Sequence, residues 1–232
     1  MLGGKMKAFT LGFDDGVVQD RRLVTILNKY GIKCTFFLNS DLFGRRSDRI
    51  LNDVLIDTSR IERSEVVPLY EGHEIAAHAL THKPLAEITL EDAYREAELD
   101  RVALSAISGY EVTGFAYPNG SVNDEVVRML RERTGIKYAR WNGDSMSFDP
   151  PCELLKMNYT ARFTNDAIFD LAKEFIALKP ETPKIFSIFG HAYEFDAFSS
   201  WERLEDFCRL ISGHDDIYYA CARDCFLKED NR

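Results

Sequence analysis

The chain has 232 residues, of which 45% are apolar and 29% charged, and its net charge is −9. This length suits one domain with a sizeable core, and we expect a single catalytic domain over residues 1–232. The negative charge argues against a nucleic-acid partner and against adhesion to an anionic membrane. No apolar run approaches about 18 residues, so no transmembrane helix is predicted.

The N-terminal stretch MLGGKMKAFTLGF runs straight into two acids, without a longer apolar region or a small-residue cleavage site. It predicts a cytoplasmic chain, unless a leader was removed. The cysteines are odd in number and irregularly spaced, which agrees with a reducing compartment. Cys221 and Cys225 can in principle bind a metal together, but structural thiols are the better interpretation of all five: Cys34, Cys152, Cys208, Cys221 and Cys225.

Short β-branched and aromatic runs alternate with longer stretches of helical periodicity in the N-terminal half. Strands are predicted at 6–13, at 34–39 and within 73–82, and helices at 20–31 and 89–109. The second helix opens with Thr89 and has an acid at position 92, in capping-box spacing. Residues 41–60 are polar and irregular, which indicates a loop or a short helical excursion.

The C-terminal half continues the alternation. Strands are predicted within 114–120 and at 137–141, 154–161, 184–192 and 216–222; helices are predicted at 165–178, at 200–212 and at 123–135, the last closed by Gly135. Repeated β–α units whose strands are apolar on both faces predict a mostly parallel sheet. About seven or eight strands are compatible with a closed barrel and with an open sheet.

Polar side chains follow several of these strands. Asp14 and Asp15 end the first strand, His78 and His82 follow a strand in the first half, and His191 ends a late one. Ligands in barrels and open α/β sheets gather at the carboxyl ends of the strands. These side chains are therefore expected to meet in one pocket.

The FDDG stretch sets two carboxylates side by side after an apolar run. A tight turn explains one Asp and Gly16, but not a second acid next to Phe13. A cation would give the two acids separate tasks. One carboxylate can bind the cation, while the other takes a proton from a water whose pKa the cation lowers from about 15.7 toward about 7.

The HALTH stretch places His78 and His82 four residues apart. On a helical turn this spacing presents both imidazoles on one face, close enough to share a metal. A carboxylate from another strand end would complete a site of two histidines and one acid, with open positions for water and substrate.

His191 follows an apolar strand directly. It is either a core histidine or a general acid for a leaving amine or alkoxide. The YPNG stretch, around Asn119, is either an ordinary turn or a source of backbone N–H groups that stabilise an oxyanion. His73 and His214 receive no role.

Together, FDDG, HALTH, FAYPNG and IFGHAYEF occur in the order and approximate spacing of the polysaccharide deacetylase family, the NodB-homology carbohydrate esterases. The resemblance covers nearly the whole chain. It implies an α/β fold, a distorted (β/α) barrel with about seven strands. It also implies metal-dependent removal of N- or O-linked acetyl groups from sugars, so an acetylated sugar or glycan is the expected partner.

The resemblance also implies roles for single residues. Asp14 resembles the general base, His191 the general acid, and the backbone N–H of Asn119 an oxyanion donor. Asp15, His78 and His82 look like the ligands of one divalent metal ion, with zinc favoured and cobalt, nickel, manganese or iron also compatible with N/O ligation. Tyr117, Pro118 and Tyr193 are the candidates for substrate binding.

Some positions depart from the family pattern. Ala116 stands where the third motif often has an arginine that orients the base, and Arg140 at the end of the KYARW strand is a candidate replacement. In the second motif, Ala79 and Lys83 replace the usual hydroxyl residue and proline, and Pro84 comes one place later. In the third, Asn119 replaces the usual aromatic residue. None of these changes removes a candidate ligand or proton-transfer group.

Three alternatives remain open from the sequence. The same scaffold can hydrolyse a non-sugar C–N bond in a linear or cyclic amide. Two histidines and one acid also suit an Fe(II) oxygenase, which has no use for Asp14. A catalytically silent sugar-binding protein would not need every ionisable group that is present here. The sequence identifies neither the acetylated substrate nor the oligomeric state.

Overall fold

The computed structural model describes residues 2–227 of the chain. Strand β1 (Lys7–Asp14) lies at the centre, and all eight of its residues are buried, as expected for a strand covered on both faces. It pairs in parallel with β10 (Lys184–His191) and with β2 (Cys34–Leu38). The register with β10 places Asp14 opposite His191, so the first and last catalytic candidates end adjacent strands.

The main sheet closes on itself. Its strand order is β8–β7–β6–β5–β2–β1–β10–β9, and these neighbours pair in parallel. Along the chain β8 and β9 are separated only by Thr160, so one short segment pairs with β7 at one end and with β10 at the other. Its further strands are β5 (Glu74–Ala77), β6 (Gly114–Ala116), β7 (Tyr138–Asp144), β8 (Met157–Tyr159) and β9 (Ala161–Arg162), and β11 (Ile217–Tyr219) joins β1.

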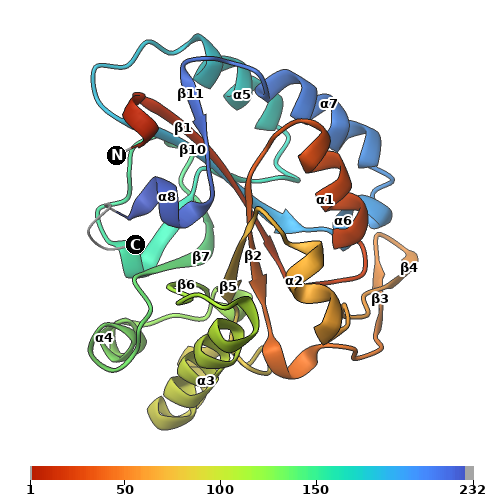
Figure 1. Cartoon of the computed structure of the whole chain (residues 1–232), viewed down its shortest axis with the longest axis vertical. Coiled ribbons are helices and arrows are strands. Elements are labelled where there is room, and N and C mark those ends of the chain that lie inside the picture. Colours follow the sequence, from red (N-terminus) through yellow and green to blue (C-terminus); the bar gives the residue numbers. More distant parts are fainter. Residues whose placement is uncertain (1, 228–232) are drawn as a thin grey trace.

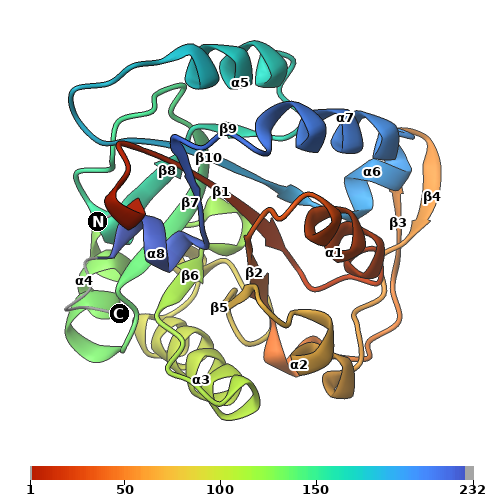
Figure 2. The same ribbon diagram turned by 45° about the horizontal axis from the view of Figure 1, so that its top comes forward.

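With β8 and β9 counted as one, the closed sheet has seven strands in the part of the chain that the structure describes. The prediction of a distorted barrel of about seven strands is therefore confirmed. The helices lie on the outside of this sheet (Figures 1 and 2). They are α1 (Asp20–Lys29), α2 (Val66–Leu69), α3 (Leu90–Ser108), α4 (Asp124–Arg133), α5 (Ile168–Ala177), α6 (Tyr193–Ala197), α7 (Trp201–Ile211) and α8 (Ala222–Phe226).

One predicted helix end is confirmed by the structure, and another lies at a different residue. The Thr89 side chain accepts a hydrogen bond from the Asp92 N–H at 3.1 Å, which confirms the predicted start of α3. Helix α4 ends at Arg133 rather than at Gly135, because Thr134 already has extended backbone angles. Helices α2, α6 and α8 were not predicted, since four or five residues are too few to show a helical period.

The barrel has two apolar layers. The larger one lies between the sheet and the outer helices, and a smaller one fills the interior with Phe37, Tyr138, Tyr159 and Phe189. Ala222 of α8 belongs to the inner layer, so this short helix covers the amino end of the barrel. The cysteines are free thiols, exposed only at Cys152. Among the described residues, no helix is both long and apolar enough to cross a bilayer.

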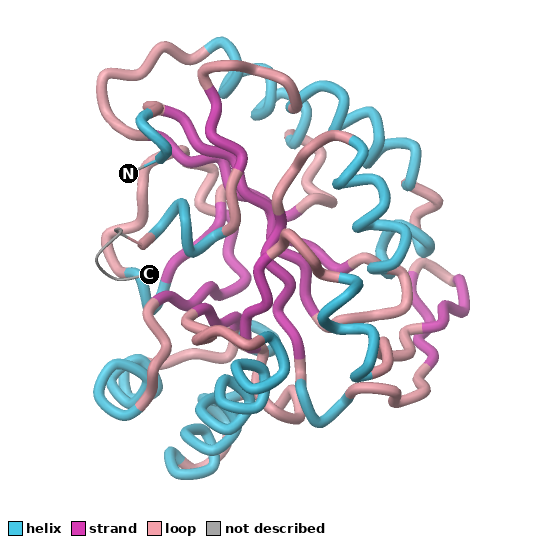
Figure 3. Tube along the Cα trace, in the orientation of Figure 1, coloured by secondary structure: helices cyan, strands magenta, loops and turns pink. Residues whose placement is uncertain are grey.

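The prediction for residues 41–60 was wrong. This region contains an antiparallel hairpin of β3 (Asp48–Leu51) and β4 (Val54–Asp57), which lies at one side of the molecule (Figures 1 and 3). Asn52 and Asp53 form its turn with φ values of 52° and 59°, as a type I′ turn requires. Ile50 and Leu55 face each other across the hairpin while 72% and 70% exposed. The apolar residues that flank this turn are mostly exposed, so they do not alternate with polar residues as in a half-buried strand.

Candidate active site

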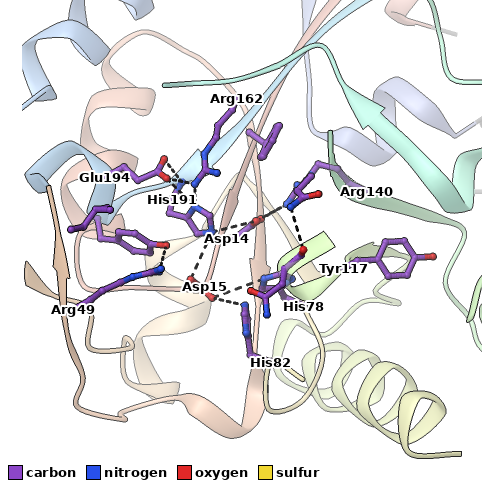
Figure 4. Close-up of a pocket in the computed structure, with 15 residues that line it drawn as sticks. Asp14, Asp15, Arg49, His78, His82, Tyr117, Arg140, Arg162, His191 and Glu194 are labelled. Carbon is purple, nitrogen blue, oxygen red and sulfur yellow. Dashed lines mark hydrogen bonds and ion pairs between the residues drawn. The ribbon is translucent and has the colours of Figure 1, made fainter. Parts of the chain in front are cut away.

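A cavity of about 230 Å³ opens at the carboxyl ends of the barrel strands (Figure 4). All but one of the ten predicted site residues line it. These are Asp14, Asp15, His78, His82, Tyr117, Asn119, Arg140, His191 and Tyr193. Pro118 is buried and is absent from the lining residues of this cavity.

The turn after β1 brings the two adjacent carboxylates into the same cavity. Successive side chains of a strand point to opposite faces, so a simple extension of β1 would separate Asp14 from Asp15. Asp15 instead has a φ of 86° and Gly16 one of 64°, a region that non-glycine residues rarely occupy. A Cβ atom on Gly16 would lie 2.9 Å from Leu38 Cδ2, so both the angle and the space at this position require glycine.

The two histidines also reach the cavity through left-handed backbone. Ala79 and His82 both have a φ of 63°, and the residues between the histidines form a turn rather than the helical turn expected from their spacing. The ring centroids of His78 and His82 are 4.8 Å apart. Their Nε2 atoms lie 4.0 Å and 3.6 Å from Asp15 Oδ1.

Helix α3 holds this turn with two buried carboxylates one helical turn apart. Asp100 Oδ2 accepts a hydrogen bond from the His78 N–H at 2.9 Å, and its Oδ1 accepts from the Ser40 N–H and hydroxyl. Glu96 accepts from the N–H of Thr81 at 2.8 Å and from its hydroxyl at 2.6 Å. The backbone on both sides of the left-handed Ala79 is thereby fixed to one helix.

The ring orientation of His78 leaves one nitrogen facing Asp15. Its Nδ1 lies 2.7 Å from the Ala116 carbonyl oxygen and donates to it, so the Nε2 lone pair is free. Burial lowers the pKa of His78 to about 4, against the opposing charge of Asp14. The ring is therefore neutral at physiological pH, which is the form that binds metals.

The donor set of Asp15, His78 and His82 fits one divalent cation. One ligand atom from each residue lies within 4.8 Å of the other two, and tetrahedral donors about 2.1 Å from an ion are about 3.4 Å apart. Asp15 Oδ1 is buried and accepts no hydrogen bond of good geometry from the described residues. This oxygen faces the Nε2 atoms of both histidines and also lies within ion-pair distance of Arg60, so one carboxylate and two nitrogen donors converge, as cation binding requires.

Arg60 contacts both the side chain and the backbone carbonyl of Asp15. Its Nη2 lies 2.9 Å from Asp15 Oδ1, and its Nη1 donates to the Asp15 carbonyl oxygen at 2.6 Å. Burial by itself raises the pKa of Asp15, but the charge of Arg60 and the nearby histidines outweigh it and hold the pKa well below its usual range. Asp15 is therefore a carboxylate at neutral pH.

Asp14 has a different partner. Arg140 Nη2 donates to both Asp14 oxygens, at 2.7 Å and 2.6 Å. The guanidinium is buried in the barrel interior, with its centre 5.3 Å, 5.6 Å and 4.6 Å from the rings of Phe37, Tyr159 and Phe189. Burial opposes ionisation, but Arg140 and the neighbouring histidines lower the pKa of Asp14.

His191 faces both acids with one nitrogen. Its Nε2 lies 3.9 Å from Asp14 Oδ2 and 4.0 Å from Asp15 Oδ2. Its Nδ1 lies 3.4 Å from Glu194 Oε1, and Arg162 pairs with the same Glu194 oxygen. Burial disfavours the imidazolium, yet the Glu194 hydrogen bond and the two aspartates together raise the pKa of His191. These contacts thus favour the protonated form of the ring that faces the cavity.

Sequence reasoning missed several residues of this cavity. Glu194 stands three residues after His191 on α6, and that spacing was a usable signal. Arg162 ends the two-residue β9, and Arg49 comes from the unpredicted hairpin. Neither lies next to a recognisable motif. Only the closed sheet and the hairpin bring these arginines to the mouth of the barrel (Figure 4).

The aromatic candidates do not offer free ring faces. Tyr117 is 2% exposed, points away from the acids in Figure 4, and donates its hydroxyl to the Leu155 carbonyl at 2.6 Å. Tyr193 is 4% exposed, and its ring centroid lies 4.9 Å from that of His191. Its hydroxyl accepts a hydrogen bond from Arg49 at 3.1 Å. Asn119 lies at the cavity in left-handed backbone, with a φ of 55°.

Known proteins resemble the chain in sequence and fold. The sequence model of the polysaccharide deacetylase family matches residues 3–139. A peptidoglycan-N-acetylmuramic acid deacetylase of Bacillus subtilis is 26% identical over 140 residues, which are 60% of this chain and 26% of that protein. A chitin deacetylase of Pestalotiopsis sp is 31% identical over 153 residues, 66% of this chain and 47% of that protein. The chain thus spans about a quarter and about half of these relatives.

A solved structure supports the same fold over almost the whole chain. A protein of Mycobacterium smegmatis assigned to the polysaccharide deacetylases superposes with a TM-score of 0.66 at 16% identity, covering 95% of this chain and 89% of its own. The family match spans more than half of the chain and includes Asp14 as well as the three residues of the candidate metal site, Asp15, His78 and His82. The chain belongs to the polysaccharide deacetylase family.

Proposed function

We propose that the chain is a metal-dependent hydrolase that removes an N- or O-linked acetyl group from a carbohydrate. One observation carries this proposal. The adjacent carboxylates have separate partners, since Asp15 faces the Nε2 atoms of His78 and His82 whereas Asp14 is bound by Arg140. Two acids in one cavity can then perform two tasks.

Asp15, His78 and His82 would hold the cation. When bound there, a divalent cation would lower the pKa of a coordinated water toward about 7 and polarise the acetyl carbonyl. Asp14, which is ionised and oriented through both of its oxygens, takes the proton from the attacking water. Arg140 limits the basicity of Asp14, but it fixes the direction in which the carboxylate accepts that proton.

His191 is the proton donor in this proposal. Its raised pKa favours the imidazolium, and Glu194 lies next to the other ring nitrogen. His191 Nε2 transfers a proton to the leaving nitrogen or oxygen as the C–N or C–O bond breaks, so that acetate and the free amine or alcohol are released. The Asn119 N–H, at the edge of the cavity, is the proposed donor to the carbonyl oxygen as it gains charge.

Relatives support the substrate class. One is named for the N-acetylmuramic acid of peptidoglycan and the other for chitin. On this basis we propose that the substrate of this chain is also an acetylated sugar. We propose a cytoplasmic location, which would favour a small or precursor glycan over a wall polymer.

Acetate release from a panel of N- and O-acetylated sugars, measured with and without a chelator, tests the proposal. The expected result is release that stops with chelator and returns when Zn, Co, Ni, Mn or Fe is added. A linear amide, a cyclic ureide and an imide belong in the same panel. Hydrolysis of one of these without any acetate release would replace the proposed substrate by a non-sugar amide. Turnover that needs oxygen would overturn the hydrolytic assignment.

A further inference from the structure

A second cavity adjoins the candidate active site on the side of the hairpin. Its volume is about 370 Å³, and it shares Asp15, Arg49, His82 and Tyr193 with the first. Two of the three candidate metal ligands, Asp15 and His82, therefore lie at the boundary of the two cavities. A substrate whose acetyl group lies beside Asp15 can extend directly into the second cavity.

Arginines dominate the charge of this second cavity. Arg45, Arg49 and Arg60 line it, and its carboxylates are Asp15 and Asp48. Arg60 pairs with Asp15, whereas Arg45 and Arg49 form no ion pair within residues 2–227. A chain with a net charge of −9 thus places three arginines against two carboxylates in a cavity beside its candidate active site.

Two of the three arginines are anchored through their guanidinium groups. Arg49 Nη1 donates to the Tyr193 hydroxyl at 3.1 Å, and its guanidinium lies 5.7 Å from the centre of that ring. Arg60 Nη1 donates to the Asp15 carbonyl oxygen. Arg45 is fixed through its backbone, since its carbonyl oxygen accepts from the Arg60 N–H at 2.9 Å, and Arg45 and Arg49 are exposed. Each anchored guanidinium leaves further N–H groups unused.

We propose that Arg45, Arg49 and Arg60 form a subsite for a phosphate group attached to the acetylated sugar. This rests on the proposed deacetylase function and narrows its substrate to a phosphorylated sugar. Planar guanidinium groups bind phosphate oxygens through paired, charge-assisted hydrogen bonds, and several converging arginines suit a phosphate or a diphosphate. The phosphate belongs to a sugar phosphate, a nucleoside diphosphate sugar or a lipid-linked sugar diphosphate, which share this chemistry.

The first test compares kcat/KM for neutral and phosphorylated forms of the same sugar. The probes are N-acetylglucosamine and N-acetylgalactosamine, each offered free, as the 1-phosphate, as the uridine diphosphate conjugate and as a short-chain prenyl diphosphate. At least one phosphorylated form should exceed the neutral sugar by about 10-fold or more. The form with the highest kcat/KM identifies the source of the phosphate. Equal values for neutral and phosphorylated forms would overturn the subsite.

Two variants and a matched control assign the effect to the cavity. Arg45→Gln and Arg49→Gln should each reduce the ratio of phosphorylated to neutral kcat/KM by about 10-fold, and salt should weaken the preference. Arg46→Gln removes the same charge from the neighbouring residue, which does not line the cavity, and should leave the ratio unchanged. An equal loss in Arg46→Gln would show a general effect of charge and contradict the proposal.

A binding measurement separates this inference from the proposed function. Glucosamine 1-phosphate has no acetyl group, so its affinity relative to glucosamine can be measured by calorimetry without turnover. A phosphate preference that Arg45→Gln and Arg49→Gln remove supports the subsite even if no probe releases acetate, in which case the deacetylase proposal alone fails. Acetate release without any phosphate preference in kinetics or binding refutes the subsite and leaves the deacetylase proposal intact.

Discussion

Both ends of the barrel bury carboxylates, but they surround them differently. At the amino end, Glu74 accepts hydrogen bonds from the Thr35 hydroxyl, the Tyr138 hydroxyl and the Arg223 N–H at 2.8–3.0 Å. At the carboxyl end, Asp14 and Asp15 face a cavity and pair with arginines. Burial raises the pKa of Glu74, whereas the arginines and histidines lower the pKa of both aspartates despite burial.

The comparison separates a structural charge from a functional one. Burial of an ionisable group is common to both ends and does not identify a site. What distinguishes the carboxyl end is that its carboxylates line a cavity together with histidines, and that arginines keep these acids ionised. Four substitutions test this distinction.

Asp14→Asn should have the largest effect. It removes the proposed proton acceptor and keeps the shape of the side chain, so kcat/KM for deacetylation should fall by about 10²–10⁴-fold. Metal content should stay at the wild-type level, because the ligand set is untouched. Steady-state kinetics and metal analysis of the purified protein provide the measurement. Loss of metal to the extent seen in Asp15→Asn would contradict the division of tasks between the two acids.

Arg140→Met should reduce kcat/KM by about 10²-fold and change its pH dependence. Arg140 favours the ionised form of Asp14, so its removal raises the pKa of a carboxylate that is active when deprotonated. The acidic limb of the pH profile should therefore move to higher pH. Arg140→Lys keeps the charge without the planar guanidinium and should move the limb less. An unchanged acidic limb in Arg140→Met would exclude Arg140 as the partner that sets the ionisation of Asp14.

Asp100→Asn should weaken metal binding by about 10–100-fold, the range seen when groups behind a ligand are removed. The amide cannot accept from both the His78 N–H and Ser40, so the turn that carries His78 is no longer fixed. Competition with a fluorescent chelator measures the affinity. Glu91→Gln is a matched control on the same helix, since Glu91 is exposed and pairs only with surface arginines. A similar loss in the control would argue against a positioning role for Asp100.

Glu74→Gln should affect stability and not chemistry. Its amide nitrogen cannot replace a carboxylate oxygen that accepts hydrogen bonds, so the free energy of unfolding should fall by about 1–3 kcal/mol. Urea denaturation measures this loss. The kcat/KM of the folded variant should stay within about twofold of the wild type, because Glu74 lies at the other end of the barrel. A large kinetic defect without destabilisation would remove the distinction between the two ends.

The sequence predicted the fold well where burial leaves a pattern. Strands β1 and β10 are apolar along their length, and α3 has both a helical period and a cap at Thr89. The two aspartates, His78 and His191 could be found because each ends or directly follows a strand, and His82 through its spacing of four residues from His78. Arg140 could be named because it ends a predicted strand, although its pairing with Asp14 depends on the closed sheet.

The remaining features depend on contacts between residues far apart in the chain, which no local sequence pattern indicates. The hairpin at 48–57 is mostly exposed, and Ile56 is the one residue of its two strands that is buried. Arg49 and Arg162 reach the cavity because of that hairpin and of a strand of two residues. The turn between His78 and His82 is left-handed because α3 holds it through Glu96 and Asp100, which lie 14 or more residues away along the chain. Sequence spacing alone suggested a helical turn there.

Thr160 marks the seam at which the barrel joins itself. The ladder between β9 and β10 covers only Ala161 and Arg162, and the ladder between β7 and β8 contains a register shift. Arg140 stands on one side of this seam and Arg162 on the other, so the seam lies between the partner of Asp14 and the partner of Glu194. Short ladders exchange their amide hydrogens fastest. Opening of this junction would therefore shift Arg140 and Arg162, the arginines that pair with Asp14 and Glu194, while the eight-residue ladder between β1 and β10 keeps Asp14 opposite His191.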